Sequence, residues 1–374
     1  MIKIISFDIG NTIYKIAKRH KLSQISIMLE RDLEDVKDIY KKTFQVKNVT
    51  FKQNAKDFLR ALNISTEEKN INSLEEILIN NSNNLEYVST STEKILKDLK
   101  EKNYKIILLS NTHRKDNKAK LLKLIDKSYY SFEIGCLKTD KKTYKMIEKD
   151  LNVKKQEFLH IGDNYQTDYL YPIKNGWNAV LVNNKDHDCI VLEDLEELIK
   201  ILNGIDKNSV ELKDYTYLYK IIYQMEKDRL SFILDASMEV YHVGSTSVEG
   251  LCAKPIIDIA IVVNNLNDIL PYVKTMEKQG YYFRDDNGVK GEYLFHRGDG
   301  DKRYCYVHVI EKDSTRYNNF MNFKKYLEEH KETITEYNNL KKELEKKYKT
   351  DRKKYTEGKN DFIQRILKEY KDNK

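Results

Sequence analysis

Short apolar runs alternate with amphipathic segments through the first half of the chain. The run at 2–7 ends in Asp8 and Gly10, which predicts a buried strand followed by a sharp turn. The same pattern predicts strands at 104–109, 158–161 and 179–182, and helices at 91–102 and 141–151. Strands that alternate with helices form a parallel sheet with helices on both faces. The first half is therefore predicted to be an α/β domain.

A long helical insertion is predicted between the first two strands. Residues 23–85 carry apolar positions three or four apart, such as Leu33, Val36 and Ile39, with little strand signal. This spacing indicates several amphipathic helices, which we expect to pack together outside the sheet.

The second half has a different order of elements, which predicts an α+β domain. A boundary with Gly204 is predicted at 203–208. Helices are predicted at 188–202, at 216–234 and from 318 to the end; strands are predicted at 240–243 and 256–263, with a hairpin at 293–296 and 304–310.

Length and composition limit the number of domains, the location and the partners that we expect. A chain of 374 residues exceeds the usual size of one domain, so two or three are expected. Its longest apolar stretch in the second half, 256–263, is far shorter than the roughly 20 residues that span a bilayer. Four dispersed cysteines and the lack of a signal pattern at the start predict a cytoplasmic protein with no membrane partner. The net charge of +7 lacks long basic blocks, so nucleic acid is possible but not favoured.

Acidic side chains stand at the carboxyl ends of two predicted strands. Asp8 follows the first strand, Asp163 follows the strand at 158–161, and Asp168 opens the next helix. Ligands of parallel sheets bind at the carboxyl ends of the strands, and neighbouring carboxylates repel unless a cation lies between them. Oxygen ligands of this kind suit Mg²⁺, which also binds substrate phosphates. The sequence therefore predicts a magnesium site.

A hydroxyl and a lysine complete this first set. Ser110 ends the strand at 104–109 and could hold a phosphate oxygen, while Lys138 could neutralise the transferring group. With Asp8 and the acid pair, they provide a nucleophile, a phosphate clamp, a charge neutraliser and a metal site for phosphoryl transfer. Each residue alone has an ordinary alternative, such as a turn or a helix cap.

The order and spacing of these segments resemble the four motifs of the haloacid dehalogenase (HAD) superfamily over about residues 1–200. The resemblance implies that Asp8 is the nucleophile that forms an aspartyl-phosphate, and that Ser110 and Lys138 hold the phosphoryl group. The insertion, about 15–88, would be a small helical cap. The resemblance implies these ligands of Mg²⁺: Asp8, the carbonyl of Gly10, Asp163 and Asp168. Thr12 and Asn111 are also assigned to phosphate binding.

Gly10 departs from the superfamily pattern, in which an Asp two residues after the nucleophile is the general acid/base. Loss of such a group typically costs about 10²–10⁴-fold in rate. Three interpretations stay open. The domain is a slow phosphatase or one for good leaving groups; it takes its acid/base from another residue, such as His113 or one of the cap; or it binds phosphate without turnover.

A second motif follows the predicted strand at 240–243. The small residues of its turn let backbone amides approach a phosphate, and an acid follows on the next strand. The stretch 242–259 closely resembles the GrpB family, and the likeness extends over about 213–370. It implies a nucleotidyltransferase-like fold without a settled reaction. Phosphate or nucleotide binding is assigned to Gly244, Ser245, Thr246, Lys254, Asp258 and His308.

The chemistry of this second motif stays open. Two-metal nucleotidyl transfer needs a second carboxylate two residues after Asp258, where the chain has Ala260. Nucleotidyl transfer, nucleotide or phosphoanion binding without transfer, and a structural role all remain. The basic C-terminal helices, with Lys341 and Arg352, could touch RNA, although a solvated face is the ordinary expectation.

The sequence thus predicts two domains, at 1–202 and 213–374, joined by a linker at 203–212. The first is predicted to be an Mg²⁺-dependent phosphatase for a small phosphorylated metabolite, and the second to bind a nucleotide or another phosphoanion. The alternatives are a nucleotidyltransferase with an accessory first domain, and a non-catalytic regulatory protein with two degenerate sites. No oligomeric state is indicated.

Overall fold

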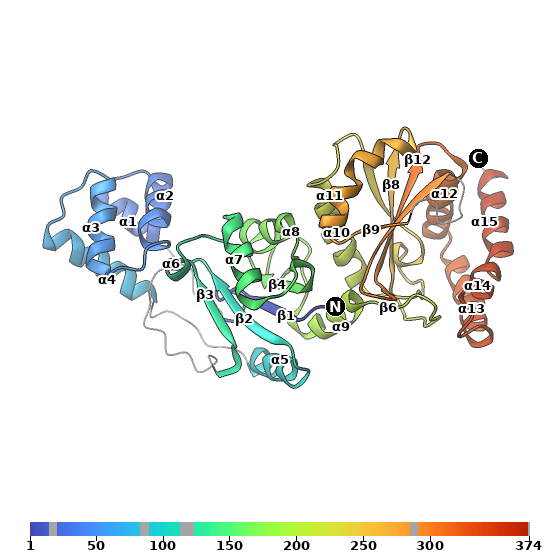
Figure 1. Ribbon diagram of the computed structural model, residues 1–374, viewed down its shortest axis with the longest axis horizontal. Coiled ribbons are helices and arrows are strands. Elements are labelled where there is room, and N and C mark those ends of the chain that lie inside the picture. The colour runs from blue at the N-terminus through green and yellow to red at the C-terminus, as the bar shows by residue number, and fades with distance from the viewer. Residues whose placement is uncertain (15–20, 83–89, 113–122, 285–290, 373–374) are drawn as a thin grey trace. The chain divides into compact units, whose positions relative to one another are not determined.

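The computed structural model describes residues 1–14, 21–82, 90–112, 123–284 and 291–372 (Figure 1). Contacts divide the chain into two compact units, Lys3–Glu193, and Asp194–Lys374 with Met1–Ile2. The division falls ahead of the predicted linker 203–212. Residues of that linker form strand β6 (Ile205–Asp206), which pairs with β11 (Lys302–Arg303) of the same unit. The domain boundaries themselves stay a prediction.

The first unit contains a five-stranded parallel sheet in the order β3-β2-β1-β4-β5. Its strands are β1 (Ile4–Phe7), β2 (Lys105–Ser110), β3 (Lys127–Tyr130), β4 (Phe158–Gly162) and β5 (Asn178–Leu181). The predicted α/β class is confirmed. The sequence pattern missed β3, because this short edge strand buries Tyr129 alone and lacks an apolar run.

The central strands β1 and β4 are buried along their whole length. Parallel strands covered on both faces are mostly continuous apolar runs, so Ser6 and His160 are exceptions. Both are fully buried, and the Ser6 hydroxyl lies 2.8 Å from His160 Nδ1, which satisfies both groups. The two central strands deliver Asp8 and Asp163 at the same edge of the sheet.

The helices of the first unit fall into two groups, one beside the sheet and one in the insertion. The flanking helices are α5 (Thr90–Glu101), α6 (Ser131–Ile134), α7 (Lys141–Leu151) and α8 (Tyr171–Asn175). The insertion consists of α1 (Lys21–Leu29), α2 (Leu33–Phe44), α3 (Phe51–Ala61) and α4 (Glu68–Ser82). It has an aromatic core of its own in which Phe44 contacts Tyr40 and Phe58. The predicted helical insertion is therefore confirmed.

The second unit contains a mixed sheet in the order β7-β8-β12-β10-β9. Only β8 and β12 are parallel among these pairs. The strands are β7 (Glu239–Val243), β8 (Ile257–Val263), β9 (Tyr282–Phe283), β10 (Glu292–Arg297) and β12 (Cys305–Glu311). The predicted antiparallel pairing of 293–296 with 304–310 is confirmed by β10 and β12, whereas the two-residue strand β9 was missed.

Seven helices are assigned to this unit among the described residues: α9 (Leu195–Asn203), α10 (Leu218–Ser231), α11 (Val273–Lys278), α12 (Thr315–Glu329), α13 (Lys331–Lys347), α14 (Arg352–Glu357) and α15 (Asn360–Asp372). The helix predicted at 188–202 begins later in the structure, since α9 starts at Leu195. Ile190 instead forms an extended bridge with Val182, and its amide donates to the carbonyl of Leu181 at 2.9 Å. This pairing keeps the chain extended ahead of α9.

Glu226, Arg229 and Arg297 form a buried charged network in the second unit. Glu226 on α10 accepts from Arg297 Nη1 at 2.5 Å, and Arg229 Nε lies 3.6 Å from the same carboxylate. The hydroxyls of Tyr281 and Tyr304 also donate to Glu226, at 2.5 and 3.1 Å. One carboxylate is thus shared by two buried arginines, and its oxygens are satisfied by several donors.

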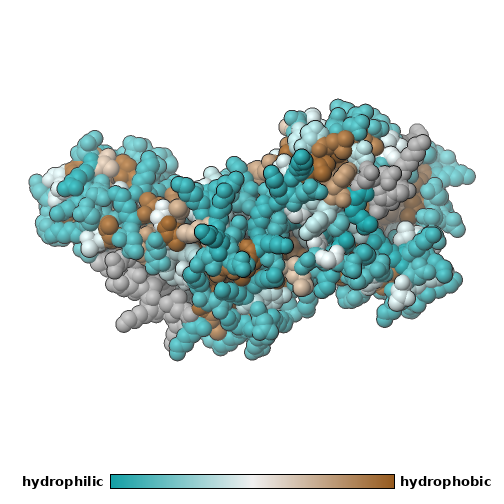
Figure 2. All heavy atoms as spheres, in the orientation of Figure 1, coloured by the Kyte–Doolittle hydropathy of each residue, from teal (hydrophilic) through white to brown (hydrophobic). Residues whose placement is uncertain are grey.

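The face of the molecule drawn in Figure 2 is mostly hydrophilic, and its hydrophobic residues form small separate groups. Within the described ranges, no helix combines the length and the apolar character that a bilayer span requires.

Candidate functional site

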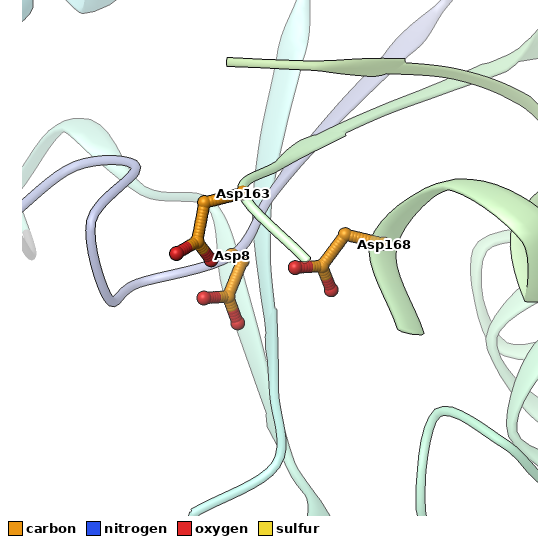
Figure 3. Close-up of side chains that lie close together, drawn as sticks. All are labelled: Asp8, Asp163 and Asp168. Carbon is orange, nitrogen blue, oxygen red and sulfur yellow. The ribbon is translucent and has the colours of Figure 1, made fainter. Parts of the chain in front are cut away.

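Three carboxylates converge at the carboxyl edge of the first sheet (Figure 3). Asp8 follows β1, Asp163 follows β4, and Asp168 lies in the helical turn Tyr165–Leu170. One oxygen of each lies within 4.8 Å of the others. Carboxylate oxygens grouped in this way are the type of ligand that a divalent cation such as Mg²⁺ binds. The donor set therefore fits the metal that the sequence predicts.

Asp168 reaches this cluster because Gly162 leaves room for it. A Cβ at position 162 would lie 2.4 Å from Cβ of Asp168, a distance that side chains do not tolerate. The amide of Asn164 donates to Asp168 Oδ2 at 3.1 Å, and the Thr167 hydroxyl donates to Oδ1 at 3.2 Å. The carboxylate is therefore fixed from two sides.

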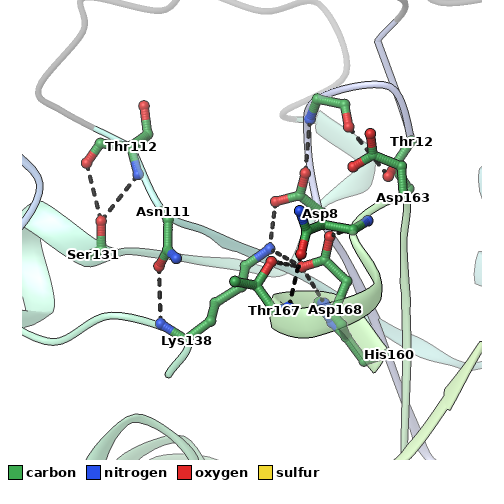
Figure 4. Close-up of polar contacts among 12 residues, drawn as sticks. Asp8, Thr12, Asn111, Thr112, Ser131, Lys138, His160, Asp163, Thr167 and Asp168 are labelled. Atoms are coloured by element: carbon green, nitrogen blue, oxygen red, sulfur yellow. Dashed lines mark hydrogen bonds and ion pairs between the residues drawn. The ribbon is translucent and has the colours of Figure 1, made fainter. Parts of the chain in front are cut away.

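Lys138 joins two of the acids (Figure 4). Its Nζ lies 2.5 Å from Asp8 Oδ1 and 2.6 Å from Asp168 Oδ1, and the side chain is 2% exposed. The lysine is positioned by its backbone, since its amide donates to Asn111 Oδ1 at 2.9 Å and its carbonyl accepts from Tyr144 at 2.8 Å. The predicted residues Asp8, Asn111, Lys138 and Asp168 thus belong to one connected group.

Charge and burial set the protonation of this group. Burial alone would lower the pKa of Lys138, but Asp168 and Asp8 outweigh it and raise that pKa above its usual value. Burial opposes ionisation of Asp168 as well, yet Lys138 brings its pKa well below the ordinary range. The pKa of Asp163 is instead raised, by burial and by the negative charges of Asp8 and Asp168. A bound cation would stabilise the ionised form of an acid whose pKa is raised in this way.

The remaining predicted residues of this site have local partners. The amide of Gly10 donates to Asp8 Oδ2 at 3.0 Å. The carbonyl of Gly10 accepts from the Thr12 hydroxyl at 3.4 Å. Ser110 is buried at the end of β2, beside β1. Their phosphate and metal contacts stay predictions. His113, proposed as a substitute acid/base, lies outside the described residues.

Two supporting residues were missed at the sequence level. His160 lies under the cluster, with Nε2 3.5 Å from Asp168 Oδ1, and Asn11 donates to Asp163 Oδ2 at 3.0 Å. The signal for His160 was a histidine within an apolar run, which implies a buried group in need of a partner. Nothing in the local sequence identifies the partner of Asn11, because Asp163 is distant along the chain.

The second candidate site surrounds Asp258 at the start of β8. Gly244 has φ of 71°, and a Cβ there would lie 2.6 Å from Asp258 Oδ2, so glycine permits the close approach of the turn to the acid. His308 on the neighbouring strand β12 has Nε2 3.5 Å from Asp258 Oδ1. The structure therefore brings Gly244, Asp258 and His308 together.

An acid that the sequence analysis did not single out completes this contact. Glu292 at the start of β10 lies 2.6 Å from His308 Nδ1 and accepts from Arg316 Nε at 2.7 Å. Its side chain is buried, because β10 pairs with β12 and places it next to the histidine. The antiparallel hairpin register, rather than any local motif, creates this Arg-Glu-His-Asp chain.

The turn hydroxyls of the motif are already engaged. Ser245 hydrogen-bonds with the side chain of Tyr337, and Thr246 Oγ1 lies 3.1 Å from His242 Nε2. Ala260 is fully buried in an apolar cluster, so its position offers no ligand. The predicted phosphate contacts of Ser245 and Thr246 stay predictions, as does that of the half-buried Lys254.

His308 should titrate far above an ordinary histidine. Burial would lower its pKa, but Asp258 and Glu292 outweigh burial and raise the pKa to about 9. Since the folded-state pKa exceeds the unfolded one of about 6.5, the stabilisation is complete below pH 6.5 and is lost as the pH rises through 9. An NMR titration should give a His308 midpoint near 9, and Glu292→Gln should lower it. A midpoint near 6.5 in the wild type would contradict this arrangement.

Comparison with known proteins places both units in families. Residues 2–170 match the family model described as haloacid dehalogenase-like hydrolase, and residues 209–369 match that of the GrpB protein. The chain is 30% identical over 167 residues to YqkA of Bacillus subtilis, which covers 44% of this chain and 48% of YqkA. It therefore spans about half the length of that relative.

Two further similarities cover almost all of the other protein. The glutamate-rich protein GrpB of Alkalihalophilus pseudofirmus is 30% identical over 171 residues, covering 44% of this chain and 98% of GrpB. A HAD family enzyme from Bacteroides thetaiotaomicron, solved in complex with magnesium and inorganic phosphate, is 16% identical and has a TM-score of 0.37, covering 50% of this chain and 97% of that one. The chain therefore belongs to the GrpB family through its second unit, and its first unit is a domain of the HAD-like hydrolase family.

Proposed function

We propose that the first unit is an Mg²⁺-dependent phosphohydrolase that acts on a small phosphorylated metabolite through Asp8. The observation that carries the proposal is the connected group of Asp8, Lys138 and Asp168, with Asp163 at the same sheet edge. Membership of the HAD-like hydrolase family supports a hydrolytic reaction. The second unit is proposed to bind a nucleotide or another phosphoanion.

Each side chain of the first site has a definite task in this proposal. Asp8 attacks phosphorus, and its carboxylate is oriented by Lys138 Nζ on Oδ1 and by the Gly10 amide on Oδ2. Lys138 is protonated and fixed, so it offsets negative charge on the transferring group without moving. Mg²⁺ would be held by Asp8, Asp163, Asp168 and the Gly10 carbonyl, and would neutralise charge on the phosphate oxygens.

Gly10 restricts the substrates that this arrangement serves well. Position 10 carries no group that protonates the leaving oxygen or deprotonates the attacking water. A leaving group of low pKa departs without a proton, whereas an alkoxide does not. The proposed enzyme therefore acts faster on acyl and aryl phosphates than on alkyl phosphate esters.

The test is phosphate release by the full chain from three substrates: acetyl phosphate, 4-nitrophenyl phosphate and glycerol phosphate. With Mg²⁺ we expect release above the spontaneous rate from the first two and slower release from the third, and chelator should abolish it. Release that persists at the same rate in chelator would contradict metal-dependent hydrolysis. Absence of release from every substrate would point to phosphate binding without turnover.

Binding without transfer is the better proposal for the second unit. Nucleotidyl transfer needs acids free to hold two metal ions, but Ala260 replaces one and Glu292 is occupied by His308 and Arg316. Asp258 lies opposite the Gly244 turn, and cationic side chains gather near it. These features support capture of an anion.

A further inference from the structure

Four basic side chains from three separate segments of the second unit lie near one another, and two of them, Lys254 and Lys359, are close enough to Asp258 to be attracted by it. Lys254 comes from the loop before β8, Lys341 from α13, and Arg352 and Lys359 from α14 and the turn after it. Lys341 is 1% exposed, which corrects the expectation that the basic C-terminal helices present only a solvated face. The other three are half-buried.

These cations act on one another rather than on matching carboxylates. Lys254 is repelled by Arg352 and by Lys359, and Lys359 is repelled by Arg352. Asp258 is the carboxylate that attracts both Lys254 and Lys359. Among the described residues, none of the four cations forms an ion pair within 4.0 Å.

Carbonyls and aromatic rings hold the cations in place. Lys341 Nζ donates to the carbonyl of Cys252 and lies 4.5 Å from the ring centre of Tyr337. Arg352 Nη1 donates to the carbonyl of Lys207 at 3.0 Å and to the Tyr306 hydroxyl at 2.9 Å.

Lys359 Nζ lies 4.7 Å from the ring centre of Tyr355. Such contacts fix position while leaving the positive charge uncompensated.

The arrangement carries a cost for the protein without a ligand. Burial, together with Arg352 and Lys359, lowers the pKa of Lys254 to about 7. Burial also lowers the pKa of Lys359 to about 8 and that of Lys341 to about 7. Grouped, partly desolvated cations destabilise a fold unless an anion offsets their charge.

We propose that Lys254, Lys341, Arg352 and Lys359 bind a linear polyphosphate anion, an inference that rests on the phosphoanion binding proposed above. When a bound anion keeps all four cations protonated, they and Asp258 carry a net charge of three, more than one orthophosphate dianion neutralises. Their origin in three segments suits an extended chain of phosphates better than a single tetrahedral ion. Because Ser245 and Thr246 are engaged with protein partners, the cations supply the main contacts.

Calorimetric titration of the full chain in chelator tests this site, because chelator removes metal-dependent binding by the first unit. The probes are inorganic tripolyphosphate, ATP and orthophosphate. We expect tripolyphosphate and ATP to bind at least tenfold more tightly than orthophosphate. A clear advantage of ATP over tripolyphosphate would identify a nucleoside triphosphate as the source of the polyphosphate, and equal affinity would identify the phosphate chain alone as the ligand.

Two variants with a matched control locate the binding. Lys359→Met and Lys341→Met should each weaken tripolyphosphate binding at least tenfold, whereas Lys353→Met removes an exposed charge beside Arg352 and should change it less than twofold. Lys359→Met should also raise the melting midpoint of the second unit, since it removes repulsion. A lowered midpoint in that variant would overturn the account of an uncompensated cluster.

The outcomes separate this inference from the function on which it rests. Tripolyphosphate binding by the wild type that survives in both lysine variants would overturn the assignment to this cluster, while phosphoanion binding would stand. Orthophosphate binding as tight as that of tripolyphosphate would overturn the polyphosphate class alone. Failure of all three probes to bind would overturn the proposed function of the second unit together with the inference.

Discussion

Gly10→Asp is expected to raise the rate of phosphate release from alkyl phosphates by about 10²–10⁴-fold. The substitution supplies a carboxyl group two residues after the proposed nucleophile, where it can protonate the leaving oxygen and then activate water. The backbone tolerates it, because Gly10 does not adopt a positive φ. The amide of residue 10, which donates to Asp8 Oδ2, is retained. The measurement is kcat for glycerol phosphate and for 4-nitrophenyl phosphate.

Gly10→Asn is the matched control, since it has the same size without an ionisable proton. We expect the gain from Asp to be larger for glycerol phosphate than for the aryl ester, because the poorer leaving group depends more on protonation. Equal gains from Asn and Asp would assign the effect to loop geometry. Absence of any gain from Asp would mean that another residue already serves as the acid/base, or that the step is not limiting.

Asp8→Asn is expected to reduce metal-dependent phosphate release to the background rate. An amide does not attack phosphorus to form an acyl phosphate, so the covalent route is closed rather than slowed. The side chain keeps its size, and its oxygen can still accept from Lys138 or from the Gly10 amide. The readout is kcat at increasing Mg²⁺ with 4-nitrophenyl phosphate.

Asp163→Asn separates loss of the nucleophile from loss of a metal ligand. This variant should need more Mg²⁺ for half-maximal rate and should recover in excess metal, because the proposed role of Asp163 is limited to metal binding. Activity lost through Asp8→Asn should not return at any Mg²⁺ concentration. Recovery of the Asp8 variant in excess Mg²⁺ would show that its carboxylate is a ligand and not the nucleophile.

Local chain pattern was sufficient to place the first candidate site. The apolar strands before Asp8 and Asp163 predicted both the parallel sheet and the edge at which those acids meet, since each strand of such a sheet ends on the same side. Gly162 was visible in the sequence, but its role in admitting Asp168 depends on a distance of 2.4 Å that only the fold reveals. The contacts of Lys138 with Asp8 and Asp168 were not predicted, because the sequence assigned this lysine only to the phosphoryl group.

The second site shows why pattern was insufficient elsewhere. Glu292 meets His308 through strand register, and Lys341 meets Cys252 through the return of a helix to a distant loop. Both contacts join residues far apart in sequence, and a lysine-rich helix has no local feature that distinguishes its buried cation from its solvated ones. Short edge strands such as β3 escape for a related reason, because pairing rather than hydrophobicity defines them.

The buried network around Glu226 constrains how this chain can drift in sequence over generations. Loss of the single carboxylate would leave Arg297 and Arg229 without their shared anion, at a cost of about 3–5 kcal/mol. That is a large part of the roughly 5–15 kcal/mol that keeps a typical domain folded. An apolar replacement of the whole group could be tolerated, whereas a single substitution that removes the carboxylate carries the full cost. We therefore expect Glu226 and its two arginines to be replaced together rather than one at a time.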